Sequence, residues 1–115
     1  MKDQIEFSEF LDIEKKLEIK TGKVTEVEDV PKSSKLIKLT VEFGDRFVQD
    51  TRTVVTNIKP VLGEDYKEQL LLNSFLFITN LKPVVMMGIE STAMILPGEL
   101  PGNLIKVNTN GVNIL

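Results

Sequence analysis

Cysteine and histidine are both absent from the 115 residues. Without them the sequence has no disulfide, no thiolate nucleophile, no Ser-His-Asp relay and none of the usual zinc ligand sets. Acidic residues such as Asp45, Asp50 and Glu90 are scattered along the chain, at no spacing that indicates acid–base catalysis or a metal cage. A glycine-rich phosphate loop is also missing. These absences predict a protein that is not an enzyme and that uses neither a metal nor a cofactor.

Long apolar runs are missing as well. No run reaches the length of a membrane span, and the first residues, MKDQIEFSEF, place acids where a signal peptide has a basic region and an apolar stretch. We therefore expect a cytoplasmic protein with no membrane partner. Tryptophan is absent, and Phe7, Phe10, Phe75 and Phe77 stand in patterns that predict core positions. Stacking of bases on several exposed rings, the usual grip on single-stranded nucleic acid, is thus poorly supported.

With a net charge of −3, the chain lacks the strongly basic character of proteins that bind nucleic acid non-specifically. Basic residues are nevertheless unevenly placed, because Lys32, Lys35 and Lys38 lie close together in PKSSKLIKL, directly after an acidic stretch. A solvated turn of mixed charge and a local phosphate-binding patch both fit this pattern.

Hydrophobic periodicity predicts one domain, residues 1–115, made mainly of strands. Apolar residues at near-helical spacing after Ser8 predict a short helix at 7–13. Glycine and proline mark turns at 44–46 and 82–88, and a change of parity at Gly22 predicts a β-bulge. Regular structure should end at 97–103, with short pairing in 104–115. The predicted strands are 17–27, 35–43, 52–58, 75–81 and 89–96, with a short helix in 64–72.

Three strands, a helix and two more strands follow the order of an OB-fold, a five-stranded Greek-key barrel. We therefore predict an all-β OB-fold with a short N-terminal helix and a short helix between the third and fourth strands. The same pattern also suits an SH3-like barrel or a small β-sandwich.

Three segments point to a family. LEIKTGKVTEVEDVPKSSKLIKLTVEFG, TRTVVTNI and NLKPVVMMGIESTAMIL occur in this order over roughly residues 7–97. The most specific part is the run Asn80-Leu81-Lys82-Pro83, then Gly88, then Ser91 and Met94. In these residues the chain resembles the tRNA-binding domain family, which includes the C-terminal domain of bacterial methionyl-tRNA synthetases, stand-alone dimeric tRNA-binding proteins and CsaA.

The resemblance implies a non-catalytic accessory protein that binds tRNA by shape and backbone, as a homodimer. Because the extensions at 1–16 and 97–115 carry apolar residues beyond a minimal five-stranded barrel, we expect the dimer interface there. It also implies two alternatives: a CsaA-like peptide-binding, export-related chaperone acting on unfolded peptide, or a module that docks onto an aminoacyl-tRNA synthetase. The candidate nucleic-acid-binding residues are Lys32, Ser34, Lys35, Arg52, Asn80, Lys82, Ser91 and Met94.

Each candidate also has a structural interpretation. Asn80 could bond a turn and Lys82 could simply reach solvent, as such residues do at many strand ends. Arg52 could pair with Asp50 instead of a phosphate. Met94 could fill the core, an interpretation that the sequence slightly favours, or form the apolar floor of a groove.

Overall fold

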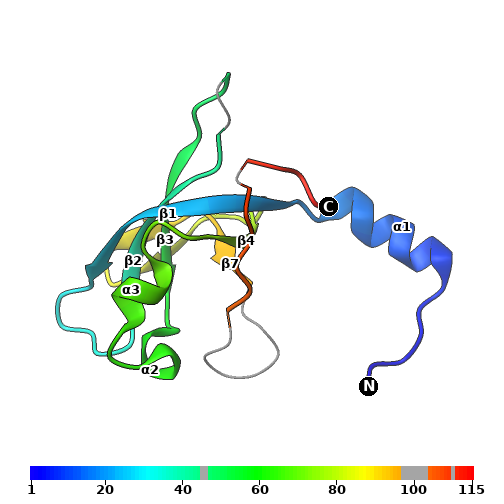
Figure 1. Ribbon diagram of the computed structural model, residues 1–115. Helices are drawn as coiled ribbons and strands as arrows, with labels where there is room; N and C mark the ends of the chain where they lie inside the picture. The colour runs from blue at the N-terminus through cyan, green and yellow to red at the C-terminus, as the bar shows by residue number, and fades with distance from the viewer. Residues whose placement is uncertain (45–46, 97–103, 110) are drawn as a thin grey trace.

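A curled, antiparallel five-stranded sheet forms most of the computed structural model, which describes residues 1–44, 47–96, 104–109 and 111–115 (Figure 1). The strand order is β3-β2-β1-β4-β7, and a separate hairpin pairs β5 with β6. This half-barrel confirms the predicted OB-like, all-β fold. The elements are α1 (Phe7–Lys16), β1 (Ile19–Asp29), β2 (Ile37–Glu42), β3 (Thr51–Thr56), α2 (Lys59–Leu62), α3 (Tyr66–Leu70), β4 (Ser74–Ile78), β5 (Val84–Met86), β6 (Ile89–Ser91) and β7 (Met94–Ile95).

The long strand β1 serves two sides of the half-barrel. Its first part pairs with β4 and its second part with β2, and the register shifts between Val24 and Glu26. The predicted bulge therefore exists, but it lies beyond Gly22. Gly22 instead leaves room for the core, since a Cβ atom there would stand 2.6 Å from the Phe43 ring and 2.7 Å from Val41. Only glycine, which has no Cβ atom, lets the Phe43 and Val41 side chains lie this close to the backbone of β1.

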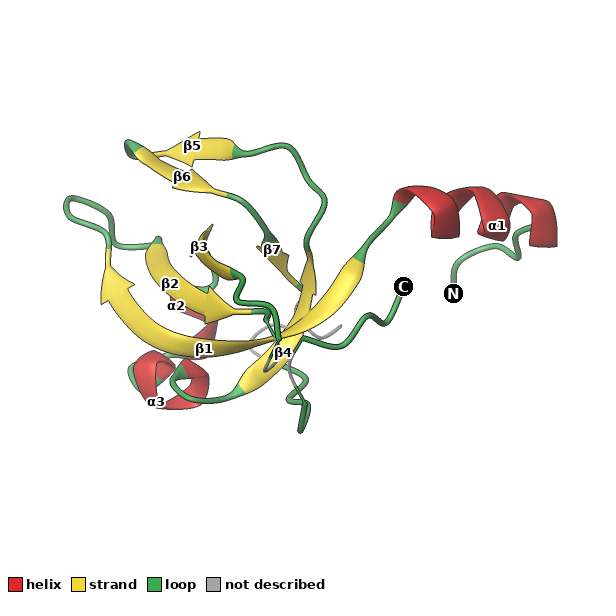
Figure 2. Ribbon diagram, turned by 90° about the horizontal axis from the view of Figure 1, so that it is seen from above, coloured by secondary structure: helices red, strands yellow, loops and turns green. Residues whose placement is uncertain are grey.

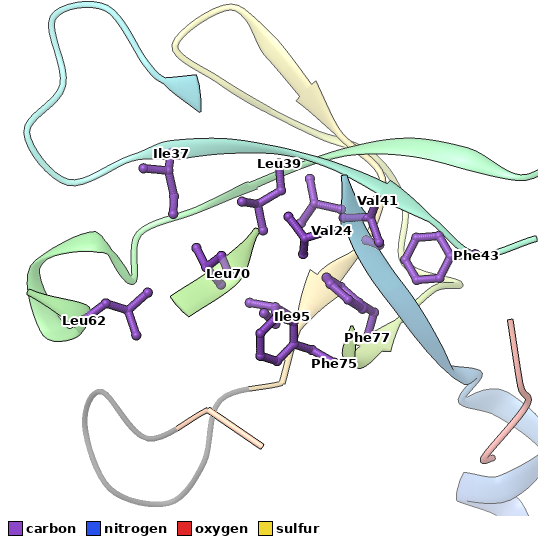
Figure 3. Close-up of a cluster of buried hydrophobic side chains, with 12 residues drawn as sticks. Val24, Ile37, Leu39, Val41, Phe43, Leu62, Leu70, Phe75, Phe77 and Ile95 are labelled. Atoms are coloured by element: carbon purple, nitrogen blue, oxygen red, sulfur yellow. The ribbon is translucent and has the colours of Figure 1, made fainter. Parts of the chain in front are cut away.

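Alternation in the strands builds the core. In β2, Ile37, Leu39 and Val41 are buried, whereas the residues between them are half-buried. Phe75 and Phe77 of β4 point into the same cluster (Figure 3), where the rings of Phe43 and Phe77 meet edge to face at 5.1 Å between centroids. Leu62 and Leu70 bring α2 and α3 onto this core. The predicted core positions of Phe75 and Phe77 are confirmed, whereas those of Phe7 and Phe10 are wrong, because both rings are exposed on α1.

The segment after β4 differs from prediction. Residues 82–88 are not only a turn, because Val84–Met86 forms β5, and the predicted strand 89–96 is divided into β6 and β7. Met87 and Gly88 have φ of 50° and 80°, the left-handed geometry favoured in two-residue hairpins. Figure 2 shows the resulting hairpin folded back over the open side of the curled sheet.

Hydrogen bonds to β3 explain why the fifth strand is divided. The backbone N–H of Thr92 donates to the Thr53 carbonyl at 3.1 Å, and the N–H of Val55 donates to the Ser91 hydroxyl at 2.9 Å. These contacts turn the chain across the gap between β3 and β7. The Thr92 hydroxyl also donates to the Thr53 carbonyl at 3.4 Å, so bonds at Ser91 and Thr92 join this segment to β3. A continuous strand would not reach both β3 and β4.

Both ends of the chain extend beyond the sheet. Helix α1 runs further than predicted, has no buried residue and projects away from the half-barrel (Figure 1). The predicted helix in 64–72 is present as α3, preceded by the short α2. Isolated bridges pair Lys20 with Asn113 and Ser74 with Val107, which confirms short pairing at the C-terminus. Residues 45–46 of the predicted turn and the predicted break at 97–103 lie outside the described residues.

No helix in the described part of the chain is both long enough and apolar enough to cross a membrane.

Candidate nucleic-acid-binding surface

The loop between β1 and β2 presents three predicted site residues to solvent. Lys32, Ser34 and Lys35 are all exposed. The Ser33 hydroxyl accepts hydrogen bonds from the backbone N–H groups of Lys35 at 3.3 Å and Leu36 at 3.0 Å, so the loop has a defined turn at its centre. This turn leaves both ammonium groups at the surface, where they are available to phosphate oxygens.

Arg52 is held at the opposite end of the half-barrel. Its guanidinium makes two hydrogen bonds of 3.0 Å to the Asp50 carboxylate and donates to the Thr79 carbonyl at 2.7 Å. The guanidinium carbon also lies 5.3 Å from the centroid of the Phe43 ring. Arg52 thus links β3 to the end of β4, and a phosphate could reach only the donors that these contacts leave.

Asn80 lies next to this linkage and bonds to backbone atoms near the end of α1. Its side-chain oxygen accepts from the N–H of Glu18 at 2.9 Å, and its side-chain nitrogen donates to the carbonyl of Lys16 at 2.6 Å. Both polar atoms of the amide are therefore used inside the protein. Asn80 positions α1 relative to β4, which is the structural interpretation that the sequence left open.

Lys82, Ser91 and Met94 come together in one apolar groove under the hairpin, with a volume of about 100 Å³. Ser91 is only 6 % exposed, because its hydroxyl accepts from Val55 and donates to the Ala93 carbonyl at 3.2 Å. Met94 is 47 % exposed, so its interpretation as a core residue is wrong. The division of the strand explains both placements. The other lining residues are Val55, Leu81, Val84, Met86 and Ala93.

A second hollow, which the sequence did not predict, lies between the β1–β2 loop and the helices α2 and α3. It has a volume of about 440 Å³ and is lined by Ser34, Lys59, Pro60, Gly63, Glu64 and Tyr66. The sequence offered one signal, a single tyrosine at the start of a predicted helix, but nothing that placed it beside Ser34.

An ionic cluster forms one side of this hollow. The Asp29 carboxylate accepts hydrogen bonds from the Tyr66 hydroxyl and from Lys59, whose ammonium lies at 3.1 Å, and Lys67 approaches at 3.7 Å. The Tyr66 hydroxyl, followed by Lys59, lowers the pKa of Asp29 below its ordinary value. The bond to Asp29 correspondingly raises the pKa of Lys59. Because Asp29 and Lys67 are exposed to water and Lys59 and Tyr66 are only half-buried, the cluster orients side chains more than it stabilises the fold.

Comparison with known proteins identifies the family. The model of the putative tRNA binding domain matches residues 19–110, most of the chain. The chain belongs to this tRNA binding domain family. The resemblance seen in the sequence is thereby confirmed, and the family is one of binding modules.

Curated relatives of this tRNA-binding domain are methionine–tRNA ligases. The enzyme of Methanococcus vannielii is 37 % identical over 102 residues, which cover 87 % of this chain. That of Archaeoglobus fulgidus is 38 % identical over 105 residues and 90 % of the chain. The chain spans only 14 % of the length of either relative. It therefore corresponds to one part of a much larger synthetase.

Solved structures of similar length share the fold. A MetRS-related protein from Pyrococcus horikoshii is 31 % identical and superposes with a TM-score of 0.77, covering 99 % of this chain and 100 % of its own. The CsaA chaperone protein of Picrophilus torridus has a TM-score of 0.72 at 20 % identity, covering 97 % of this chain and all of its own. At that identity the likeness concerns the fold alone.

Proposed function

We propose that this protein is a non-catalytic accessory factor that binds tRNA through its shape and phosphate backbone. The observation that carries the proposal is the match of the tRNA binding domain family to residues 19–110. The exposed ammonium groups of Lys32, Lys35 and Lys82 are suited to phosphate oxygens. Arg52 and Asn80, whose side chains are bonded within the protein, hold β3, the end of β4 and α1 in place.

We further propose that two copies form one extended binding surface through α1 and the C-terminal segment. Phe7, Phe10 and Ile13 of α1 are 73 %, 37 % and 46 % exposed. A helix of 10 residues is marginal in water without packing. The C-terminal segment lies beside the start of β1, just after this helix, since the Ile19 N–H donates to the Leu115 carbonyl at 2.8 Å. Val112 and Ile114 of the C-terminal segment are also exposed, so both extensions offer apolar side chains to a second copy.

The test is a titration of tRNA at two salt concentrations against the wild type and a variant with Lys32, Lys35 and Lys82 changed to Glu. Binding should weaken with salt, and the slope should fall by about 1 for each lysine that contacts a phosphate. As a control at single positions, Lys2→Glu alters the net charge as much as Lys32→Glu does and should lose far less affinity. Equal losses in these two single variants would reject Lys32 as part of the contact surface.

A second candidate is supported by the apolar groove under the hairpin, in which Leu81, Val84 and Met94 are exposed. Such a groove suits the side chains of an extended, unfolded peptide, as a chaperone-like role requires. Binding of an uncharged peptide that survives the triple lysine reversal but is lost on Met94→Glu would favour this candidate. The family's presence within methionine–tRNA ligases also keeps docking onto a synthetase as a role to be tested by co-purification.

A further inference from the structure

The hollow between the β1–β2 loop and the helices α2 and α3 is shallow and open to solvent, and it is large enough to receive part of a larger ligand. Its volume of about 440 Å³ falls within the range of about 300–1,000 Å³ that is usual for small-ligand sites. Ser34 borders it from the loop, whereas Pro60 and Tyr66 border it from the helices. The loop after the first strand is one that OB-folds use to hold oligonucleotides. The hollow therefore opens where a bound RNA strand is expected.

Tyr66 supplies an aromatic ring to the hollow. It is the chain's only tyrosine, there is no tryptophan, and its ring is half-buried against the core while it lines the hollow. The bond from its hydroxyl to Asp29 holds the ring in place. A ring held in this way presents apolar area without losing much side-chain freedom on binding, which suits contact with a flat, apolar ligand.

The charges around the ring favour a base over a bare phosphate. Lys59 lies 5.0 Å and Lys67 5.9 Å from the centroid of the Tyr66 ring, but Asp29 pairs with both ammonium groups. Glu64 at the rim adds a second negative charge. An isolated anion would thus meet little net positive charge, whereas the carbonyl and ring-nitrogen acceptors of a base can accept from a lysine that remains paired.

We propose that this Tyr66 pocket receives one unpaired base of the bound tRNA, which packs against Tyr66 and Pro60 while Lys59 donates to its edge. The proposal rests on the proposed function, and adds to it a single-nucleotide contact beside the backbone contacts of Lys32 and Lys35. Single-stranded bases in RNA are commonly recognised by such contacts with aromatic side chains.

The test uses the single tyrosine as a reporter. Protein with a ¹³C-labelled tyrosine ring and a ¹⁵N-labelled backbone is titrated with tRNA, with a blunt RNA duplex that has no unpaired nucleotide, and with inorganic phosphate. We expect tRNA to shift the Tyr66 ring signals together with the amides of Lys32 and Lys35. The duplex should shift only the amides, and phosphate should leave the ring signals in place.

Every other outcome overturns the proposal in a recognisable way. Amide shifts with tRNA but unchanged ring signals would reject the base contact and leave the proposed function standing. Ring shifts of equal size with phosphate or duplex would make the pocket an anion site. Absence of any binding would reject both the pocket and the proposed function.

Variants supply an independent readout. Tyr66→Leu should weaken tRNA binding roughly tenfold, the usual effect of losing one base–aromatic contact, and Tyr66→Phe should restore most of that loss because it keeps the ring. Since Tyr66 also contacts the core, a second variant tests the pocket without changing the ring. Ser34→Leu narrows the pocket from an exposed position and should weaken binding without unfolding the domain. The control is Gln49→Leu, which also introduces a leucine but on an exposed loop far from the pocket. Equal affinities of Ser34→Leu and Gln49→Leu would contradict the pocket.

Discussion

The side-chain oxygen of Asn80 accepts a hydrogen bond at 2.9 Å from the backbone N–H of Glu18, a residue 62 positions earlier. The same amide donates to the Lys16 carbonyl, so both of its polar atoms hold the junction between α1 and β1. A residue expected to touch RNA is thereby shown to determine how the N-terminal helix leaves the half-barrel. Any effect of an Asn80 substitution on ligand binding therefore includes the effect of losing this junction.

Replacing Asn80 with alanine should loosen the junction between α1 and β1. Two hydrogen bonds to backbone groups are lost, at a cost of about 1–2 kcal/mol in unfolding free energy. Hydrogen exchange at the amide of Glu18 should become faster, because this N–H loses its acceptor. Asn57→Ala, at another exposed asparagine, should change neither quantity. If the Glu18 amide of Asn80→Ala exchanges at the wild-type rate, Asn80 does not hold the junction between α1 and β1.

Gly22→Ala should destabilise the core without touching any candidate binding residue. The new methyl group would lie under 3 Å from the Phe43 ring and from Val41, so buried side chains must move. Overpacking of this kind costs about 1–3 kcal/mol, which chemical denaturation measures as a lower midpoint. A midpoint equal to that of the wild type would show that β1 can shift to admit the group.

Glu42 should make stability depend on acid pH. Its carboxylate accepts from the Thr51 hydroxyl, from the Gly44 N–H at 2.9 Å and from the Asp50 N–H at 3.3 Å. These bonds, the one from Thr51 first, lower the pKa of Glu42 below its ordinary value of 4.5. The resulting stability is present above that ordinary value and is lost as the pH falls through the lowered, folded-state pKa.

Thermal unfolding from about pH 7 down to about pH 3 checks this dependence. Glu42→Gln should unfold at a lower temperature than the wild type at neutral pH, and the difference should shrink in acid, where the wild-type carboxyl is protonated. Glu90→Gln, an exposed acid on the hairpin, serves as the control. A difference between Glu42→Gln and wild type that stays constant with pH would rule out the carboxylate as its source.

Phe7→Glu combined with Phe10→Glu should separate the proposed dimer. Both rings are exposed and lie 6.2 Å apart between centroids on α1, so charge there would be buried in an interface. Light scattering should report half of the wild-type mass. Asp12→Asn, on the other face of the same helix, should leave the mass unchanged. A wild type that is already monomeric would reject the interface.

Local pattern was sufficient for most of the sheet. Alternation at Ile37, Leu39 and Val41 predicted β2, because a strand with one buried face must repeat every second residue. The same reasoning failed in residues 82–96, where Val84 and Val85 are exposed in β5 and the strand is divided after Ser91. The dividing bonds go to Thr53 and Val55, far away in sequence, so no local pattern records them.

By itself, the amino-acid sequence determined the family, the OB-like order of strands, the exposed lysines of the β1–β2 loop and the absence of the residues that most catalytic and metal sites need. Periodicity and short motifs carry this information because they depend on neighbours in the chain. Only the tertiary structure decided that Asn80 and Arg52 are bound within the protein, that Ser91 and Met94 share a groove, and that Tyr66 faces Ser34 across a hollow. These relationships depend on how a curled sheet brings distant residues together, and hydrogen bonds over such separations leave no periodic signal in the sequence.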